Sequence, residues 1–377
     1  MGVEKIHIEQ FLELSDLHPV IDVRSPGEYN HAHIPGAFNL PLFTDEERAI
    51  VGTTYKQKSR EKAIKVGLDF FGPKMRTMVE EVESLVMSRE PGVKLTAGNS
   101  RLTPESFRDH DSRTLLIYCW RGGMRSAAIA WLLDLYGFKI YTLAGGYKKF
   151  RNHVIDLFSH PFKFKILGGY TGSGKTGILK ALQKKGELII DLEEIAKHKG
   201  SAFGSIGMPQ QPTQEMFENI LGFELRRFSE IPPSGGGGAA WLEDESQRIG
   251  NINIPNKLWL NMRKSPVYFL NIPFEKRLEH LVMEYGSLDT QKMITAIERI
   301  KEKLGGLNAK NAIEFLLEGK TAESFRILLH YYDRYYLKAL HNREELNSLL
   351  TTINSDSVTP ENANHLAGLP QYQPENH

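Results

Sequence analysis

The chain has one cysteine, Cys119, and a glycine-rich segment with two arginines follows it. A thiol between a buried strand and a helix lies where backbone N–H groups and the positive end of the helix favour the thiolate. The thiolate is the nucleophilic form of cysteine. Gly122 and Gly123 permit a tight loop there, and Arg125 and Arg121 can neutralise an anionic substrate. We therefore expect Cys119, Arg125 and Arg121 to be catalytic; the alternative is an inert buried cysteine.

A second motif, at residues 169–176, reads Gly-Tyr-Thr-Gly-Ser-Gly-Lys-Thr and fits the Walker A pattern. Its glycines let backbone N–H groups converge on phosphate oxygens, Lys175 supplies a positive charge, and Thr176 can bind Mg²⁺. An expected strand before the motif and an expected helix after it argue against a chance match. The predicted phosphate-binding residues are Gly169, Gly172, Ser173, Gly174, Lys175 and Thr176.

Three acids are candidates for the carboxylate that orients a metal ion beside such a loop. Glu243 and Asp244 end an apolar stretch at 239–243, and Asp191 follows another at 188–190. The alternative for each acid is an ordinary carboxylate at the end of a strand.

Short apolar stretches that alternate with helical segments are expected to position these motifs, a pattern typical of parallel α/β folds. Cys119 follows one such stretch, and the expected helix after it begins at Ser126 and ends at Gly137. From about Phe274 onward the pattern becomes helical, and the segment after Thr359 is predicted to be frayed. The expected strands are residues 20–23, 114–118, 139–143, 164–167, 188–191, 239–243 and 267–270.

The length of 377 residues suffices for two domains with separate cores. We expect a parallel-sheet domain at 1–150, with a helical and loop excursion at about 45–110, and a connector at 151–160. A P-loop NTPase-like α/β domain should then occupy 161–377, with a helical C-terminal extension and the frayed tail. The predicted fold class is therefore α/β in both domains.

Composition restricts the partners. The 47 basic and 46 acidic residues nearly balance, which argues against a general affinity for nucleic acid. A single cysteine excludes an intramolecular disulfide and a cysteine-rich zinc site, and fits a reducing cytoplasm. The chain lacks an uncharged apolar run of ~18 residues, so we expect no membrane span and a cytoplasmic location.

The first half resembles rhodanese domains. The resemblance covers roughly residues 5–150, and its signatures lie at 22–29, 33–37, 118–126 and 143–146. One feature departs from the common pattern, because the loop from Cys119 to Arg125 is one residue longer, as in the related cell-cycle phosphatases. A longer loop makes a wider cradle, so we expect a tetrahedral, phosphate-like donor such as selenophosphate rather than thiosulfate.

A rhodanese domain fused to a P-loop domain resembles the bacterial tRNA 2-selenouridine synthase family. Further segments that resemble this family are residues 191–193, 198–204, 243–246 and 248–250. The resemblance implies action on wobble 2-thiouridine in the tRNAs for lysine, glutamate and glutamine. Geranyl diphosphate would first alkylate the sulfur, and selenophosphate would then displace the alkylated sulfur. Both are implied co-substrates, with Mg²⁺ at Thr176, and a selenophosphate-producing enzyme is an implied partner.

Two roles for Cys119 remain open. It can carry selenium as a perselenide, which matches rhodanese chemistry and is the role we favour, or it can bond transiently to the substrate. A P-loop can hold the diphosphate of an isoprenoid as readily as that of a nucleotide, so its presence does not imply ATP.

Contacts to tRNA must come from local basic patches. We expect them at Lys148, Lys149 and Arg151 and at the basic cluster of residues 56–65; the alternative is a solvated surface. Tyrosines at 331, 332, 335 and 336 share helix faces and suit either base stacking or core packing.

Three other functions fit parts of the sequence. An ATP-dependent tRNA sulfurtransferase would use the same fold with a sulfide donor. A phosphatase–kinase fusion is suggested by the longer loop, although Tyr118 stands where many such phosphatases have histidine. A non-enzymatic RNA-binding module would need neither Cys119 nor Lys175.

Overall fold

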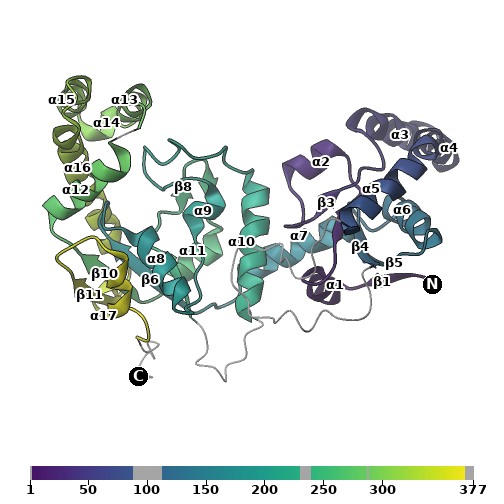
Figure 1. Cartoon of the computed structure of the whole chain (residues 1–377), viewed down its shortest axis with the longest axis horizontal. Helices are drawn as coiled ribbons and strands as arrows, with labels where there is room; N and C mark the ends of the chain where they lie inside the picture. The colour runs from purple at the N-terminus through teal and green to yellow at the C-terminus, as the bar shows by residue number, and fades with distance from the viewer. Residues whose placement is uncertain (1, 88–112, 230–238, 287, 370–377) are drawn as a thin grey trace. The chain divides into compact units, whose positions relative to one another are not determined.

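A computed structural model describes residues 2–87, 113–229, 239–286 and 288–369. The chain divides into two compact units, Met1–Asp156 and Leu157–His377, and each unit is built around its own parallel sheet (Figure 1). The predicted α/β class is confirmed for both.

The first unit contains a five-stranded sheet whose strands pair in parallel. The central strand is buried at every position, because each of its faces is covered. Leu115 and Ile117 of this strand pack in one core with the helix that follows the cysteine, and this packing fixes that helix relative to the sheet. The strand order is β1 (Val3–Ile6), β5 (Lys139–Leu143), β4 (Thr114–Tyr118), β2 (Val20–Asp22) and β3 (Phe38–Asn39).

Helices cover this sheet. The helix after the cysteine is α6 (Met124–Leu135), and α1 (Ile8–Ser15) and α7 (Gly146–Leu157) follow the strands β1 and β5. Residues 151–157 of the expected connector belong to helix α7.

The excursion between β3 and β4 is helical as far as the structure describes it, and its part from residue 88 to 110 lies outside the described residues. Phe71 and Val82 from this excursion enter the same hydrophobic core as Ile117. Its elements are α3 (Asp45–Gln57), α4 (Arg60–Phe71), a 3₁₀ turn (Gly72–Lys74) and α5 (Met75–Met87).

The second unit contains a four-stranded parallel sheet and a short antiparallel hairpin (Figure 1). Trp241, in the edge strand, is fully buried and packs against Tyr268 of β10 at a ring-centroid distance of 5.0 Å. The sheet order is β11 (Leu350–Asn354), β10 (Val267–Asn271), β6 (Phe164–Gly169) and β7 (Ala240–Glu243); the hairpin is β8 (Arg248–Ile249) and β9 (Ile252–Asn253).

Helices precede and follow the strands of this sheet along the chain. The helix after the phosphate loop is α8 (Lys175–Lys184), and α9 (Leu192–Ala196), α10 (Gln214–Ser229) and α11 (Asn256–Arg263) lie between β6 and β10 in sequence. The predicted helical C-terminal part is confirmed as α12 (Phe274–Tyr285), α13 (Thr290–Arg299), α14 (Lys301–Leu304), α15 (Gly306–Leu317), α16 (Thr321–His341) and α17 (Leu346–Leu349). None of the helices in the described ranges is long and apolar enough to cross a bilayer.

Three local expectations were wrong. Residues 188–191 make an isolated bridge, between Ile189 and Trp241, instead of a strand. The chain does not stay helical to its end, because β11 returns to pair with β10. The segment after Thr359 is not frayed up to residue 369: it forms a 3₁₀ helix (Pro360–His365), and Ala363 and Leu366 are buried in the core beside α8.

Candidate active sites on the two units

The thiol of Cys119 lies directly after β4, where the chain turns into α6. Its Sγ accepts a hydrogen bond from the Gly123 amide at 3.3 Å and lies 3.3 Å from the Ser126 hydroxyl. The side chain is only 3% exposed, so its polar contacts are with other protein groups rather than with solvent.

These contacts change the pKa of the Cys119 thiol. Burial alone would raise the pKa of the Cys119 thiol, but hydrogen bonds from the Ser126 side chain and from the amides of Gly123, Ser126 and Arg121 bring the pKa below its ordinary value. These hydrogen bonds therefore stabilise the thiolate of Cys119 relative to that of an ordinary cysteine.

The shape of the cysteine loop depends on two close backbone contacts. The amide of Tyr147 donates to the Cys119 carbonyl at 2.8 Å, and the amide of Lys148 donates to the Trp120 carbonyl at 3.0 Å. A side chain at Gly146 would place its Cβ 2.2 Å from the Cys119 carbonyl oxygen, and Gly146 has φ +58°. The start of α7 thus fixes the loop, and only glycine fits there.

The two predicted arginines take different places. Arg125 Nη1 lies 2.6 Å from Glu28 Oε2, and Arg48 Nε binds the same carboxylate at 2.8 Å. Burial would raise the pKa of Glu28, but Arg125 and Arg48 lower it. Arg121 is exposed. Arg125 is therefore held by Glu28, which was not among the predicted site residues although it belongs to the 22–29 signature.

The phosphate loop of the second unit joins β6 to α8. Gly172 and Gly174 have φ values of +81° and +74°, which side chains rarely adopt. Lys175 Nζ donates to the Gly169 carbonyl at 3.1 Å and so folds back over the loop. The amide of Gly169 donates to the Tyr336 hydroxyl at 3.1 Å, so Tyr336 helps to hold the start of the loop, and Ser173 is fully buried.

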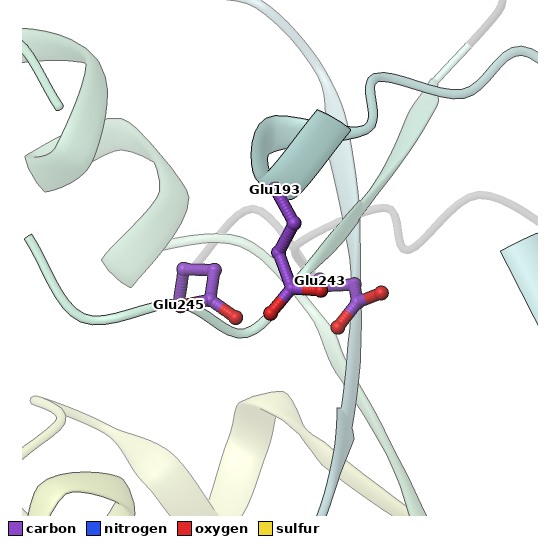
Figure 2. Close-up of side chains that lie close together, drawn as sticks. All are labelled: Glu193, Glu243 and Glu245. Carbon is purple, nitrogen blue, oxygen red and sulfur yellow. The ribbon is translucent and has the colours of Figure 1, made fainter. Parts of the chain in front are cut away.

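Three glutamates gather beside this loop. One oxygen from each of Glu193, Glu243 and Glu245 lies within 4.8 Å of the others, and Figure 2 shows their side chains converging from α9, from β7 and from the segment after β7. Thr176 Oγ1 donates to Glu243 Oε1 at 2.8 Å, which links the cluster to the motif. Burial and then the charge of Glu243 raise the pKa of Glu193 and of Glu245 above the ordinary range.

The predicted acids divide among different roles. Glu243 takes the expected position beside Thr176. Asp191 accepts the amide of Glu194 at 2.9 Å and caps α9. Asp244 pairs with Arg343 and accepts a hydrogen bond from the hydroxyl of Tyr336 at 2.9 Å. Because the same hydroxyl accepts the amide of Gly169, Asp244 helps to position the phosphate loop through Tyr336.

The cluster fits a hard divalent cation. Three carboxylates and the Thr176 hydroxyl offer only oxygen donors, the set that Mg²⁺ takes in proteins. A cation would also offset the repulsion among the three carboxylates, of which Glu243 is buried and the other two are half-buried. Glu193 and Glu245 were missed in the sequence, although they lie in the segments 191–193 and 243–246 that carry the family resemblance.

The candidate tRNA contacts differ in exposure. Lys148 and Lys149 are exposed on α7, and Arg151 is half-buried. The basic side chains of the cluster at 56–65 are exposed on and between α3 and α4.

The tyrosines of α16 mostly pack inside the second unit. Tyr331 is buried, the hydroxyl of Tyr332 accepts the Ala202 amide at 3.3 Å, and Tyr336 supports the phosphate loop. The core-packing alternative therefore describes these three side chains, while Tyr335 is 40% exposed.

Two protein families match the two units. Residues 7–69 and 82–153 match the rhodanese-like domain, and residues 162–359 match the tRNA 2-selenouridine synthase AAA domain. The second match covers the phosphate loop, the three glutamates and β11.

Curated relatives extend the match over most of the chain. A tRNA 2-selenouridine synthase of Bdellovibrio bacteriovorus is 32% identical and covers 91% of this chain and 94% of its own length. That of a Sulfurovum species is 34% identical, over 84% of this chain and 87% of its own. That of Hydrogenovibrio crunogenus is 37% identical, over 76% of each.

Both units, the cysteine loop and the phosphate loop thus lie within one continuous likeness, and the resemblance seen in the sequence is confirmed. The chain belongs to the tRNA 2-selenouridine synthase family.

Proposed function

We propose that this protein replaces sulfur by selenium in the wobble 2-thiouridine of the tRNAs for lysine, glutamate and glutamine. The observation that carries the proposal is the Cys119 thiol, held by the Ser126 hydroxyl and the Gly123 amide on a chain that also has a phosphate loop. The names of its relatives support the reaction class.

In the first step, the thiocarbonyl sulfur attacks C1 of geranyl diphosphate, the C1–O bond breaks, and pyrophosphate leaves. A thiocarbonyl sulfur leaves poorly from C2, and alkylation turns it into a good leaving group. Lys175 and the loop amides would stabilise the negative charge that develops on pyrophosphate.

Magnesium is the proposed cofactor of this step. Thr176, Glu243, Glu193 and Glu245 would hold the ion, which would supply charge neutralisation for the departing diphosphate. The protein's own contribution is to bring four oxygen donors to one side of the phosphate loop.

In the second step, selenium from selenophosphate replaces sulfur at C2. The C2–Se bond forms, geranylthiol leaves with the alkylated sulfur, and water cleaves the Se–P bond to release phosphate. The wide cysteine loop is the proposed site for the tetrahedral donor, and a selenophosphate-producing enzyme would supply it.

Cys119 would meet the selenium donor before the tRNA does. Because the residue is 3% exposed, a small anion reaches its sulfur more readily than a nucleobase. If selenium passes to Cys119 as a perselenide, the Se–P electron pair stays on phosphorus, phosphite leaves, and a thiol must later release the selenium. Intact-protein mass spectrometry after selenophosphate treatment tests this, because a perselenide adds the isotope pattern of selenium; an unmodified Cys119 would argue against the role.

The exposed Lys148 and Lys149, with Arg151, are the proposed tRNA contacts, because a nearly neutral protein must bind phosphates locally. Filter binding of tRNA to a Lys148→Ala, Lys149→Ala double variant measures their contribution. A cytoplasmic location follows from the proposed tRNA substrate.

Two variants separate the steps. We expect Cys119→Ala to abolish 2-selenouridine while S-geranyl-2-thiouridine still forms. Lys175→Ala, or removal of Mg²⁺ with a chelator, should lower S-geranylation by ~10²-fold or more, since a charge on the leaving group is lost. Nucleoside mass spectrometry of the treated tRNA measures both products.

Lys184→Ala, at the exposed end of α8, is the matched control and should behave as the wild type. The reverse pattern, with geranylation lost in Cys119→Ala, would assign the steps to the wrong units. Robust ATP turnover with thiolated tRNA would instead indicate an ATP-dependent sulfurtransferase, and hydrolysis of p-nitrophenyl phosphate would indicate a phosphatase.

A further inference from the structure

The carboxyl end of the first sheet brings α2 and the cysteine loop to the same place. The strands β4 and β2 are neighbours, and the connections that follow them lead in opposite directions, to β5 and to β3. Ligands of open α/β sheets bind at such a point, outside the carboxyl ends of the strands. The cysteine loop begins at this end of β4, and the turn into α2 begins at this end of β2. Charged groups near this turn are therefore candidates for binding the substrate of Cys119.

Arg48 of α3 is held near this turn by two contacts. Asp45, at the start of the same helix, accepts the amide of Gly27 in α2 at 3.0 Å. Three residues later, Arg48 Nε lies 2.8 Å from Glu28 Oε2, the oxygen that also binds Arg125 Nη1 at 2.6 Å. Because α3 belongs to the excursion between β3 and β4, this excursion supplies a second cation beside the arginine that closes the cysteine loop.

The triad of Arg48, Glu28 and Arg125 carries a net positive charge. Two guanidinium groups share one carboxylate, so one positive charge is uncompensated within the triad. Arg48 meets Glu28 through Nε, and among the described residues none pairs with its two terminal nitrogens. The Arg48 side chain is 49% exposed, so an anion that enters from solvent can reach these nitrogens.

Stability alone explains Arg48 poorly. An ion pair whose cation is half exposed contributes little to stability, because water screens it. Glu28 already binds Arg125, and it also accepts the Ser25 amide at 3.3 Å, so it has other partners. A guanidinium group with free terminal nitrogens instead matches a tetrahedral oxyanion, whose oxygens accept parallel N–H donors. Two such groups from different helices match an anion with two negative charges.

We infer that Arg48 binds the selenium donor, a tetrahedral oxyanion with at least two negative charges, together with Arg125 at the mouth of the cysteine loop. Glu28 is the positioning residue, because it holds the two guanidinium groups side by side. The inference rests on the proposed function, in which selenophosphate is the donor, and adds a binding residue from outside the cysteine loop.

Protection of Cys119 by inorganic phosphate tests the inference on the full chain. The chain has one cysteine, so alkylation by iodoacetamide reports on this loop alone, whatever phosphate binds at the second unit. At an ionic strength held constant with chloride, phosphate should slow the alkylation of the wild type in a saturable way. Arg48→Ala should raise the phosphate concentration for half-protection by ~10-fold, because charge-assisted hydrogen bonds are lost. The alkylation rate without phosphate should stay the same.

Arg76→Ala is the matched control, because it also removes an exposed arginine of the excursion that pairs with a glutamate, Glu80, at 2.8 Å. This variant should be protected at the wild-type phosphate concentration. Arg48→Lys keeps the charge without the paired donors and should give an intermediate value. The melting temperature of Arg48→Ala should stay within ~3 °C of the wild type, as expected for a half-exposed ion pair.

The complete reaction gives a second readout. Arg48→Ala should raise the KM for selenophosphate by about the same factor as the half-protection concentration, with a smaller change in kcat and with S-geranylation unchanged. Filter binding of tRNA to this variant should match the wild type. A loss of tRNA affinity in place of phosphate affinity would assign Arg48 to the RNA backbone and refute the inference.

The inference is overturned if phosphate slows alkylation no more than chloride does, or if Arg48→Ala and Arg76→Ala behave alike. It is also overturned if Arg48→Ala changes the alkylation rate equally with and without phosphate, since the arginine would then act through the fold of the loop. The proposed function fails separately, when phosphate protects Cys119 through Arg48 but selenophosphate yields no 2-selenouridine.

Discussion

The hydroxyl of Ser126 makes a polar contact with the sulfur of Cys119, which is almost fully shielded from solvent. It contributes the largest of the interactions that oppose the effect of burial on the pKa of this thiol. A hydrogen bond to a charged group contributes about 1.5–3 kcal/mol, more than one between neutral groups. The chemistry of the cysteine loop therefore depends on a side chain seven positions beyond the nucleophile.

Ser126→Ala should raise the pKa of Cys119, because the thiolate loses a hydrogen bond while the thiol loses little. At a fixed pH below the new midpoint, a smaller fraction of the thiol is ionised, so alkylation by iodoacetamide slows. The rate of alkylation against pH measures the midpoint in each protein. Ser15→Ala, at the end of α1, is the control and should leave it unchanged; an equal midpoint in Ser126→Ala would contradict the role.

The sequence identifies some site residues and cannot choose among others, for a local reason. Cys119, Lys175 and Thr176 could be predicted because their motifs fix both the residue type and the turn. Near the phosphate loop, β7 ends at Glu243, and the amide of Glu245 donates to the Glu243 carbonyl at 2.9 Å. No residue type marks this turn beyond the strand, so the sequence suggested Asp244, whereas the structure places Glu245 beside Glu243 and Glu193.

At the scale of elements, the strand β2 ends in a buried ion pair that holds the first unit together. Arg24 Nη2 lies 2.6 Å from Asp22 Oδ2, and both side chains are almost fully buried. The same nitrogen donates to the Ala32 carbonyl at 2.7 Å, and the guanidinium lies over the Tyr147 ring at 3.9 Å from its centroid. This pair links β2, the segment after α2 (Pro26–His31) and α7.

Asp22→Asn should destabilise the first unit by about 3–5 kcal/mol, because it leaves a buried cation without its partner. For a unit of this size the melting temperature should fall by roughly 6–20 °C. Differential scanning calorimetry of the full chain measures the transition, and Asp69→Asn, at an exposed site on α4, is the matched control. Equal melting of the two variants would mean that the pair contributes little.

The elements themselves were predictable where their residues pack on both sides. The strands β4 and β5 lie at the expected residues, and the nearly continuous apolar run of β4 marks a strand that is buried on both faces. The strand β11 was missed, since its burial alternates irregularly and its strand character comes from pairing with β10. Ile189 was expected in a strand, but its segment meets the sheet edge at one bridge.

At the scale of the whole molecule, the sequence supports two units because each has its own expected parallel strands and its own glycine-rich loop. The predicted boundary at residue 150 rests on the end of the rhodanese-like signature, whereas the contact density divides the chain after Asp156, within α7. Because α7 continues past the end of the rhodanese-like signature, no turn residue marks the boundary in the sequence.

Since the thiol and the phosphate loop belong to different units, the two proposed steps need not occur on the same chain. A mixture of the Cys119→Ala protein and the Lys175→Ala protein should therefore make 2-selenouridine from thiolated tRNA, geranyl diphosphate and selenophosphate. The first variant supplies S-geranylated tRNA, and the second supplies the intact cysteine loop. Each variant alone is the control and should form little product. Nucleoside mass spectrometry measures the outcome, and a mixture no more active than its components would mean that both groups must act within one chain before the tRNA is released.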